Sequence, residues 1–320
     1  MEPRQKEDAV LETRDLSRSF RRKNREIRAV AGVNLTLRPG ECLGLVGESG
    51  SGKSTLARML ASVLVPTEGE VLLRGEPVSC WRAREGRGFY RHVQMVFQNP
   101  ASAISPRMTI GEFVTQGLLY FHLCPRSNLR GKAQGLLESV GLSGEFLDRL
   151  PHQLSGGELQ RAVIARAISV NPDVLILDEA TSALDASIQR QILDLIDDLR
   201  RSRNIACLLI THDLALVRRY AERVGILYGG ELVELMNTSD LCESRCHPYT
   251  QSLLRHMLFL GQERKTIAAE IPDIHDKVSN GGCPYFVRCA EHQEVCTREL
   301  PRLRMIAPDH LTACILRHEI

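Results

Sequence analysis

Apolar and polar positions alternate in two different ways along the chain, and these changes outline the expected elements. Residues 9–46 are typical of short strands separated by turns, and they end in the apolar run CLGLVG. The segment KSTLARMLASVL follows at once with helical spacing, and the strand-like EGEVLLRG and VQMVF come next. Residues 108–168 have helical spacing with Gly or Pro at the breaks, which predicts a helical insert.

Strand signals return in DVLILDE and IACLLITH, and each of them is followed by a helical pattern. The first of these helices carries a one-sided apolar stripe at Ile188, Ile192, Leu195, Ile196 and Leu199. Short apolar strands that alternate with amphipathic helices predict a parallel sheet covered on both faces. After about residue 236 the pattern dissolves into short helices, prolines and cysteines. We therefore expect an α/β domain, a helical insert within it, and a smaller C-terminal extension.

The bulk composition is that of an ordinary well-packed protein. The 320 residues are 43% hydrophobic and 25% charged, and the formal net charge is +2. The basic run RRKNR at 21–25 is more typical of a solvated loop than of a nucleic-acid patch. We therefore expect no nucleic-acid partner.

Two features of the sequence bear on the compartment. No apolar segment approaches the roughly 18 residues that span a bilayer, and the N-terminal MEPRQKEDAV lacks an apolar signal core. We therefore expect the protein in the cytosol, where its ten cysteines stay reduced. Most of them, such as Cys42 and Cys207 inside apolar runs, are best interpreted as small buried hydrophobic residues.

The segment GESGSGKST at 47–55 fits the phosphate-binding pattern G-x-x-x-x-G-K-[ST], with a predicted strand before it and a helix after it. Its glycines let the backbone curl so that several N–H groups point at one oxyanion. Lys53 can then reach the β- and γ-phosphates, and the hydroxyl of Ser54 can bind Mg²⁺. The candidate ATP-binding residues are Gly47, Glu48, Ser49, Gly50, Ser51, Gly52, Lys53, Ser54 and Thr55.

A second candidate group lies in VLILDE at 174–179, a buried strand that ends in two carboxylates. Asp178 at the tip of the strand can hold a hydrated Mg²⁺. The adjacent Glu179 can orient and deprotonate an attacking water. A charged strand terminus without chemistry is the alternative, but the phosphate loop elsewhere in the chain favours the catalytic interpretation.

The segment LSGGELQRAVIARA at 154–167 predicts a helix that opens on an anion site. Ser155 and Glu158 have the spacing of a capping box, so we expect them to begin the helix. A helix N-terminus with bare glycine backbone binds anions. A second anion site in a chain that already has a phosphate loop requires a reason.

Together these motifs resemble the ATP-binding subunits of ABC transporters, from about residue 10 to the C-terminus. LSGGE matches the family signature, which is usually LSGGQ. FQNP supplies the Q-loop glutamine, Gln98, and THD contains the switch histidine, His212. Phe20 falls where the family places an aromatic ring that stacks on adenine. The family's D-loop is matched by Ser182, Ala183, Leu184 and Asp185.

The resemblance implies that two ATPase subunits close head to tail around two ATP molecules. It implies Mg²⁺ binding through Ser54, Gln98 and Asp178, with Glu179, His212 and Gln98 as the catalytic residues. The signature would contact the γ-phosphate of the ATP bound by the partner, through Ser155, Gly156, Gly157 and Glu158. One chain then carries two anion sites because they serve two nucleotides. Glu158 departs from the commoner glutamine, but we expect hydrolysis to survive because the catalytic and metal positions are intact.

The resemblance also implies the domain organisation, an ABC-type P-loop NTPase fold of the α/β class with an antiparallel β subdomain. The nucleotide-binding domain is expected at 1–235, and its helical subdomain, at about 101–168, matches the part that contacts membrane subunits. The small cysteine-containing C-terminal extension is expected at 236–320.

The extension contains a group of four cysteines, Cys283, Cys289, Cys296 and Cys314. Their spacing fits neither the usual zinc patterns nor the ferredoxin runs, so spacing alone leaves metal binding and four unrelated thiols both open. CHPYTQSLL at 246–254 and the pattern G-C-P…R-C…C…P-x-L…C resemble the extension of oligopeptide, dipeptide and nickel importers, where four cysteines bind an iron–sulfur cluster. The resemblance implies a 4Fe–4S cluster, with Zn²⁺ as the alternative, in a structural role.

The expected function is that of an ATPase energising an importer of di- or oligopeptides. VQMVFQNPASAISPR resembles nickel-type members, so a nickel or nickel–metallophore importer is an alternative. An alternative of another class is a soluble ABC ATPase that is not coupled to transport. The family implies a second, different ATPase subunit, two transmembrane permease subunits and an extracytoplasmic substrate-binding protein. It places this chain peripherally on the cytoplasmic face of the cell membrane.

Overall fold

The structure is a computed structural model that describes residues 9–22, 25–242, 245–259 and 281–317. The expectation that the N-terminus carries no signal core concerns residues 1–8, which lie outside the described part. Residues 23–24 in the middle of the basic run also lie outside it.

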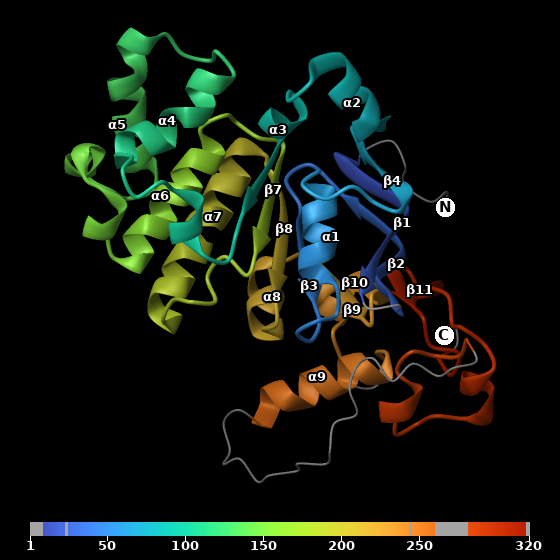
Figure 1. Cartoon of the computed structure of the whole chain (residues 1–320). Coiled ribbons are helices and arrows are strands. Elements are labelled where there is room, and N and C mark those ends of the chain that lie inside the picture. Colours follow the sequence, from blue (N-terminus) through green and yellow to red (C-terminus); the bar gives the residue numbers. More distant parts are fainter. Residues whose placement is uncertain (1–8, 23–24, 243–244, 260–280, 318–320) are drawn as a thin grey trace.

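An eight-stranded sheet runs through the centre of the chain in the order β11-β12-β10-β9-β3-β8-β7-β6 (Figure 1). The neighbouring strands from β9 to β6 are parallel, as the alternation of strands and helices predicted. The remaining three pair antiparallel at one end. The strands are β3 (Cys42–Val46), β6 (Val93–Val96), β7 (Val174–Asp178), β8 (Ala206–Thr211), β9 (Arg223–Tyr228), β10 (Glu231–Asn237), β11 (Arg304–Ala307) and β12 (His310–Thr312).

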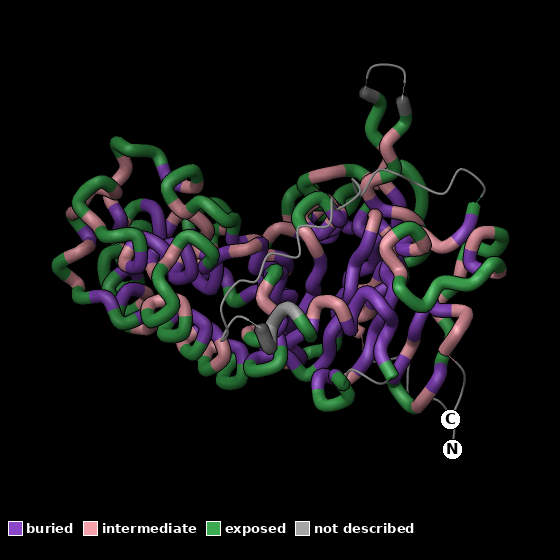
Figure 2. Tube along the Cα trace, turned by 90° about the horizontal axis from the view of Figure 1, so that it is seen from below, coloured by how far each residue is buried: buried purple, intermediate pink, exposed green. Residues whose placement is uncertain are grey.

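Both faces of the parallel part are covered, and strand β7 shows how. Val174 and Ile176 belong to the apolar cluster that contains α1 (Lys53–Leu60), whereas Leu175 and Leu177 belong to the cluster on the other face. Because side chains alternate across a strand, a continuous apolar run can supply two cores. In Figure 2 the buried residues are concentrated in the interior of the molecule, and the exposed residues lie mainly on its outside.

A separate four-stranded antiparallel sheet, in the order β2-β1-β4-β5, covers the α1 side. Its strands are β1 (Leu11–Arg22), β2 (Arg25–Leu37), β4 (Glu68–Leu73) and β5 (Glu76–Pro77). The prediction of short strands over 9–46 was wrong for the first two, which are 12 and 13 residues long. Register shifts near the left-handed Asp15 absorb the turn-like residues, so the strands continue through them.

The helices fall into an insert and a set of crossover helices. The insert between β6 and β7 consists of α4 (Ile110–Tyr120), α5 (Leu129–Ser139) and α6 (Gly156–Ile168), which confirms the predicted helical segment. Outside it lie α2 (Val78–Glu85), α3 (Phe89–His92), α7 (Ala186–Arg203) and α8 (Leu214–Tyr220). The predicted stripe of α7 faces the core through Ile192 and Ile196, which are fully or almost fully buried.

The C-terminal extension begins at β10 and returns to it, because β12 pairs antiparallel with that strand. The fully buried Glu234 of β10 fixes this return. Its carboxylate accepts hydrogen bonds from the N–H of His247 (2.9 Å), from the Thr250 hydroxyl and from Nε2 of His310 (2.8 Å). It therefore joins β10 to both α9 (Pro248–Phe259) and β12.

Candidate functional site

The predicted phosphate loop connects β3 to α1 in the expected strand–loop–helix context. Gly50 and Gly52 have φ of +81° and +105°, a region that side chains rarely allow. A Cβ on Gly47 would lie 2.2 Å from the carbonyl of Leu227, and one on Gly52 would lie 2.2 Å from that of Ala29. The loop is therefore packed against β9 and β2 through positions that only glycine fits.

The ammonium group of Lys53 lies inside this loop. Its Nζ donates hydrogen bonds to the carbonyls of Gly47 (2.7 Å) and Glu48 (2.8 Å). Burial lowers the pKa of Lys53, although the carboxylates of Glu179, Asp178 and Glu48 act in the opposite direction. A buried cation surrounded by backbone polar groups is well suited to pair with a phosphate anion.

The two candidate Mg²⁺ ligands from different motifs are in contact. The hydroxyl of Ser54, in the first turn of α1, donates to Oδ1 of Asp178 at the end of β7 (2.9 Å). Burial raises the pKa of Asp178, with Ser54 and the nearby Arg58 and Lys53 opposing that shift. Carboxylate and hydroxyl oxygens are the donors that Mg²⁺ prefers, so this pair fits that ion.

The predicted catalytic residues meet beside this pair. Nε2 of Gln98 donates to Oε2 of Glu179 (3.2 Å) and to the hydroxyl of Ser182 (3.3 Å). Nδ1 of His212 lies 4.0 Å from Oε1 of Glu179. Glu179, Ser182 and His212 line one small cavity of about 100 Å³. Two separate segments thus line a space large enough for water, and Gln98 from a third segment is hydrogen-bonded to Glu179.

The signature segment begins α6 with the capping box that the sequence predicted. The N–H and the hydroxyl of Ser155 both donate to Oε2 of Glu158, at 2.8 and 2.7 Å. These hydrogen bonds lower the pKa of the Glu158 carboxyl. A Cβ on Gly157 would lie 2.9 Å from Ile188 of α7, so this glycine allows close packing of the two helices.

The predicted D-loop residues connect the candidate carboxylates Asp178 and Glu179 to α7. Asp185 is the N-cap of α7, and its Oδ1 accepts from the N–H groups of Ser187 (3.1 Å) and Ile188 (3.0 Å). The side chain of Leu184 lies against Gly156 of the signature, 3.5 Å from where a Cβ would be placed. Ala183, which precedes Leu184, is exposed.

The remaining candidates for the ATP site are Phe20 of β1 and three residues of the segment 47–55. Phe20 of β1 is 38% exposed, and the guanidinium of Arg18 lies 4.9 Å from the centre of its ring. Ser49 is exposed, Ser51 is almost fully buried, and Thr55 is half-buried in the first turn of α1.

The four cysteines of the extension line one small pocket together with His247 and Tyr285. Burial raises the pKa of the thiols of Cys289 and Cys314, and it raises that of Cys283 to about 11. No group of three or more His, Cys, Asp or Glu side chains within the described ranges is arranged to hold a metal ion as it stands. All ten cysteines of the chain are free thiols, and Cys42 and Cys207 are buried as predicted.

Comparison with known families supports the assignment of these motifs. Residues 30–182 match the family described as "ABC transporter", and residues 233–296 match "Oligopeptide/dipeptide transporter, C-terminal region". The oligopeptide transport ATP-binding protein AppF of Bacillus subtilis (strain 168) is 36% identical over 324 residues, which cover 97% of this chain and 98% of AppF. The chain belongs to the ATP-binding proteins of ABC transporters, in the oligopeptide/dipeptide branch.

Other relatives agree with this family. A putative peptide import ATP-binding protein of Brucella abortus (strain 2308) is 40% identical over 318 residues, with 97% of this chain and 94% of the relative covered. A dimeric ATP-binding cassette in a post-hydrolysis state, bound to ADP and Pi, superposes with a TM-score of 0.65 at 28% identity, covering 71% of this chain and 98% of that one. The protein cbiO1 of Clostridium perfringens, part of an ABC transporter complex, gives 0.65 at 25% identity, with 79% and 96% covered.

Two residues of this ABC ATPase reach the phosphate loop without having been predicted. Oη of Tyr249 accepts a hydrogen bond from the N–H of Glu48 (2.9 Å), and the guanidinium of Arg288 pairs with both carboxylate oxygens of Glu48 (2.7 and 2.8 Å). Both lie in the sequence patterns HPYT and R-C that pointed to the C-terminal extension. The patterns singled out the positions, but nothing in them indicated a contact more than 200 residues away.

The candidate site of this ABC ATPase is thus formed by loops and strand ends of the α/β domain, and the C-terminal extension contacts its phosphate loop. No helix in the described ranges is both long and apolar enough to cross a bilayer.

Proposed function

We propose that this chain is the ATP-hydrolysing subunit that energises an ABC importer of di- or oligopeptides. The observation that carries the proposal is the contact between Ser54 and Asp178, with Glu179 adjacent, in a chain that also has the oligopeptide/dipeptide C-terminal region. The relatives described above are named for oligopeptide or peptide import. The nickel alternative is therefore not favoured, and neither is an ATPase unconnected to transport.

ATP binding is assigned to the phosphate loop and to Phe20. The backbone N–H groups of 47–55 and the ammonium of Lys53 would hold the β- and γ-phosphates, and the half-exposed ring of Phe20 would stack on adenine. Mg²⁺ bound through Ser54, Asp178 and Gln98 would neutralise charge on the phosphate oxygens. Anion binding is supported by the buried cation at the centre of the loop.

Hydrolysis is assigned to Glu179 and His212, which line the small cavity, and to Gln98, which is hydrogen-bonded to Glu179. Glu179 would accept the proton of the attacking water, and His212 would donate a hydrogen bond towards the γ-phosphate. Gln98 is hydrogen-bonded to Glu179 and lies between β6 and the helical insert. A change at Glu179 would therefore be transmitted through Gln98 to the insert.

The signature is assigned to the ATP bound by a second ATPase subunit. Ser155 is hydrogen-bonded within its own capping box, and it begins a helix of the insert rather than a helix beside the phosphate loop (Figure 1). The helix N-terminus and the bare backbone of Gly156 present N–H groups that suit an anion. A partner subunit, expected to be a different chain, would supply the matching phosphate loop.

The decisive test of this function is Glu179→Gln in the complete transporter complex. We expect MgATP hydrolysis at this site and peptide uptake to fall by at least about 100-fold, with equilibrium ATP binding retained, because only the proton acceptor is lost. Glu68→Gln, on an exposed glutamate at the start of β4, is the matched control and should retain activity. Unchanged turnover at the Glu179 site would remove that residue from the catalytic role.

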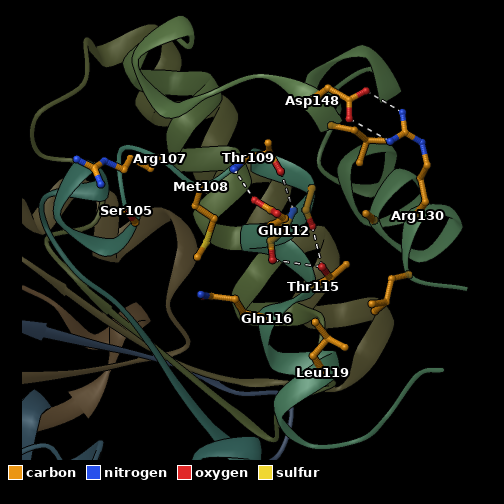
Figure 3. A pocket seen from close by; sticks show the side chains of 14 residues that line it. Ser105, Arg107, Met108, Thr109, Glu112, Thr115, Gln116, Leu119, Arg130 and Asp148 are labelled. Atoms are coloured by element: carbon orange, nitrogen blue, oxygen red, sulfur yellow. Dashed lines mark hydrogen bonds and ion pairs between the residues drawn. The ribbon is translucent and has the colours of Figure 1, made fainter. Parts of the chain in front are cut away.

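The helical insert offers a docking surface for the membrane subunits. A pocket of about 710 Å³ lies there between α4, α5 and the segment before α4, with Arg107, Met108, Gln116 and Leu119 on its walls (Figure 3). The ion pair of Arg130 with Asp148 (2.7 Å) lies at one side. Because this segment follows directly after Gln98, a permease helix held here would be linked to the ATP site.

Permease docking can be tested with a single charge. Leu119 is 36% exposed and lines the pocket, so Leu119→Asp should reduce co-purification of the permease subunits by about tenfold without lowering ATP binding by the isolated chain. Val63→Asp, on an exposed valine of the α1 side, is the control. Equal recovery of permease with both variants would exclude this pocket as the docking surface. Docking would also place the chain peripherally at the cytoplasmic face, opposite an extracytoplasmic substrate-binding protein.

The four cysteines are proposed to bind a metal group that ties the extension together. Four thiols around one pocket match the donor set of a 4Fe–4S cluster, with Zn²⁺ as the alternative, and a cation there would favour the thiolate forms that burial disfavours. Anaerobic purification with a visible spectrum and assays of iron, sulfide and zinc tests this. Absorption with iron and sulfide that is lost in Cys289→Ser supports a cluster, zinc alone changes the metal, and no metal in folded protein rejects the proposal.

A further inference from the structure

The C-terminal extension holds the phosphate loop at one residue, Glu48. The N–H of Glu48 donates to Oη of Tyr249 (2.9 Å), and its carboxylate makes a two-pronged ion pair with Arg288 (2.7 and 2.8 Å). Its carbonyl accepts a hydrogen bond from the Lys53 ammonium (2.8 Å). Every polar group of Glu48 therefore has a partner, and two of these partners, Tyr249 and Arg288, belong to the extension.

The two partners from the extension are themselves held firmly. Tyr249 is 1% exposed, and its ring packs on Tyr228 with a centroid distance of 4.7 Å. The Arg288 side chain is 17% exposed, and its guanidinium lies 5.9 Å from the ring centres of both Tyr228 and Tyr285. A bidentate pair between partly buried groups fixes geometry more strictly than a single contact on the surface.

Arg288 also changes the charge that a nucleotide meets. The side chain of Glu48 is 30% exposed, and the charge of its carboxylate raises the pKa of Lys53, against the larger effect of burial. A bare carboxylate at this position would repel the phosphates of ATP, and the pairing with Arg288 offsets that repulsion. The loop can therefore carry an acidic residue next to its first glycine without losing affinity for a polyanion.

From these contacts we propose that Arg288 and Tyr249 are positioning residues of the ATP site, which hold Glu48 so that the phosphate loop keeps its anion-binding shape and charge. The inference rests on the proposed ATPase function. It assigns to the C-terminal extension a part in nucleotide affinity, in addition to any role of its cysteines. Neither residue touches the reacting atoms.

The test is Arg288→Met in the complete complex, with MgATP hydrolysis measured as kcat and KM separately. We expect KM for MgATP to rise about tenfold while kcat changes less than about twofold, because the substitution weakens nucleotide binding and leaves the residues that carry out hydrolysis unchanged. Tyr249→Phe keeps the ring and removes only the acceptor, so it should raise KM by a smaller factor, about threefold. Equilibrium ATP binding to the isolated chain should weaken in parallel.

Matched controls separate positioning from general damage to the extension. Arg317 makes an ion pair with Glu291 (2.8 Å) in the same extension and is also 17% exposed, so Arg317→Met should leave KM within about twofold. Tyr285→Phe removes a hydroxyl from the same aromatic group without touching Glu48. If either control raises KM as much as its counterpart, the effect is structural and the inference fails.

The charge argument has its own readout in the double variant Arg288→Met with Glu48→Gln. Removing the carboxylate should restore part of the lost affinity, so KM should fall at least about threefold below that of Arg288→Met alone. No recovery would overturn the charge part of the inference. Unchanged KM in Arg288→Met, in a complex whose wild type hydrolyses ATP, would overturn the inference while leaving the proposed function intact. An inactive wild-type complex would instead contradict the proposed function.

Discussion

Glu158 closes the capping box of α6, a role that the commoner glutamine can also fill. Its Oε2 accepts from both the N–H and the hydroxyl of Ser155. The oxygen of a glutamine amide could accept the same two hydrogen bonds. The difference between the two residues is therefore the charge, which lies at a helix N-terminus where a negative group is favoured.

This comparison gives a prediction for Glu158→Gln. The helix should form equally well, and MgATP turnover of the complex should stay within about threefold of the wild type, because the catalytic and metal positions are unchanged. Steady-state hydrolysis measures the effect. An inactive wild type whose turnover is restored by Glu158→Gln would show that the carboxylate blocks the second nucleotide.

The sequence predicted single residues well where a motif ties residue type to backbone chemistry. The glycines of the phosphate loop, Lys53, and the Ser155–Glu158 capping box lie where their patterns placed them. Arg288 could not be predicted as a partner of Glu48, because 240 residues separate them and neither pattern contains the other. Such a contact follows from the path of the whole chain.

Among elements, the junction at the start of β7 is the clearest electrostatic contact between layers. Asp173 accepts hydrogen bonds from Arg74, which follows β4 (2.7 Å), and pairs with Nδ1 of His92 at the end of α3 (2.8 Å). Burial raises the pKa of Asp173, but the hydrogen bonds from His92 and Arg74 outweigh it, and the pKa lies below its ordinary value of 3.8. The ionised carboxylate therefore stabilises the folded state.

The sign of this shift sets the pH dependence. A lowered pKa in the folded protein means that the contribution is present above pH 3.8 and is lost as the pH falls through the folded value. Asp173→Asn should lower the free energy of unfolding by about 1–2 kcal/mol at pH 7, and the difference should shrink below pH 4. Urea unfolding at both pH values measures this, with the exposed Asp198→Asn on α7 as the control. A difference that is the same at pH 7 and pH 3 would contradict the assignment to charge.

Elements were predictable as far as local periodicity decides them. The parallel strands and the helical insert follow from apolar runs and helical spacing, whereas the lengths of β1 and β2 depend on bulges that periodicity does not show. The pairing of Thr312 with Glu234 was not predictable, because a three-residue strand carries too little pattern to reveal its partner.

For the whole molecule, the separation of the two anion sites makes a prediction about the complex. Ser155→Arg places a large cation at the signature, which is proposed to serve the partner's nucleotide, so turnover of the complex should fall at least about tenfold. ATP binding by the isolated chain should change little, because its own phosphate loop is intact. Lys53→Met, in contrast, should weaken ATP binding by the isolated chain. Equilibrium ATP binding and steady-state hydrolysis, measured on both variants, distinguish the two sites. Loss of ATP binding by the isolated Ser155→Arg chain would place the signature in the site of its own chain.

The pairing of β12 with β10 also has a consequence for biosynthesis. Until residues 310–312 have left the ribosome, β10 is the last strand of the central sheet, and its backbone N–H and C=O groups on that side have no strand to pair with. β10 is rich in buried apolar side chains, including Leu232, Val233 and Leu235. An unpaired apolar edge is a template for pairing with other chains. The nascent protein is therefore most prone to aggregate before β12 has emerged from the ribosome, and a chain stalled on the ribosome before that point should depend on chaperones more than the released chain.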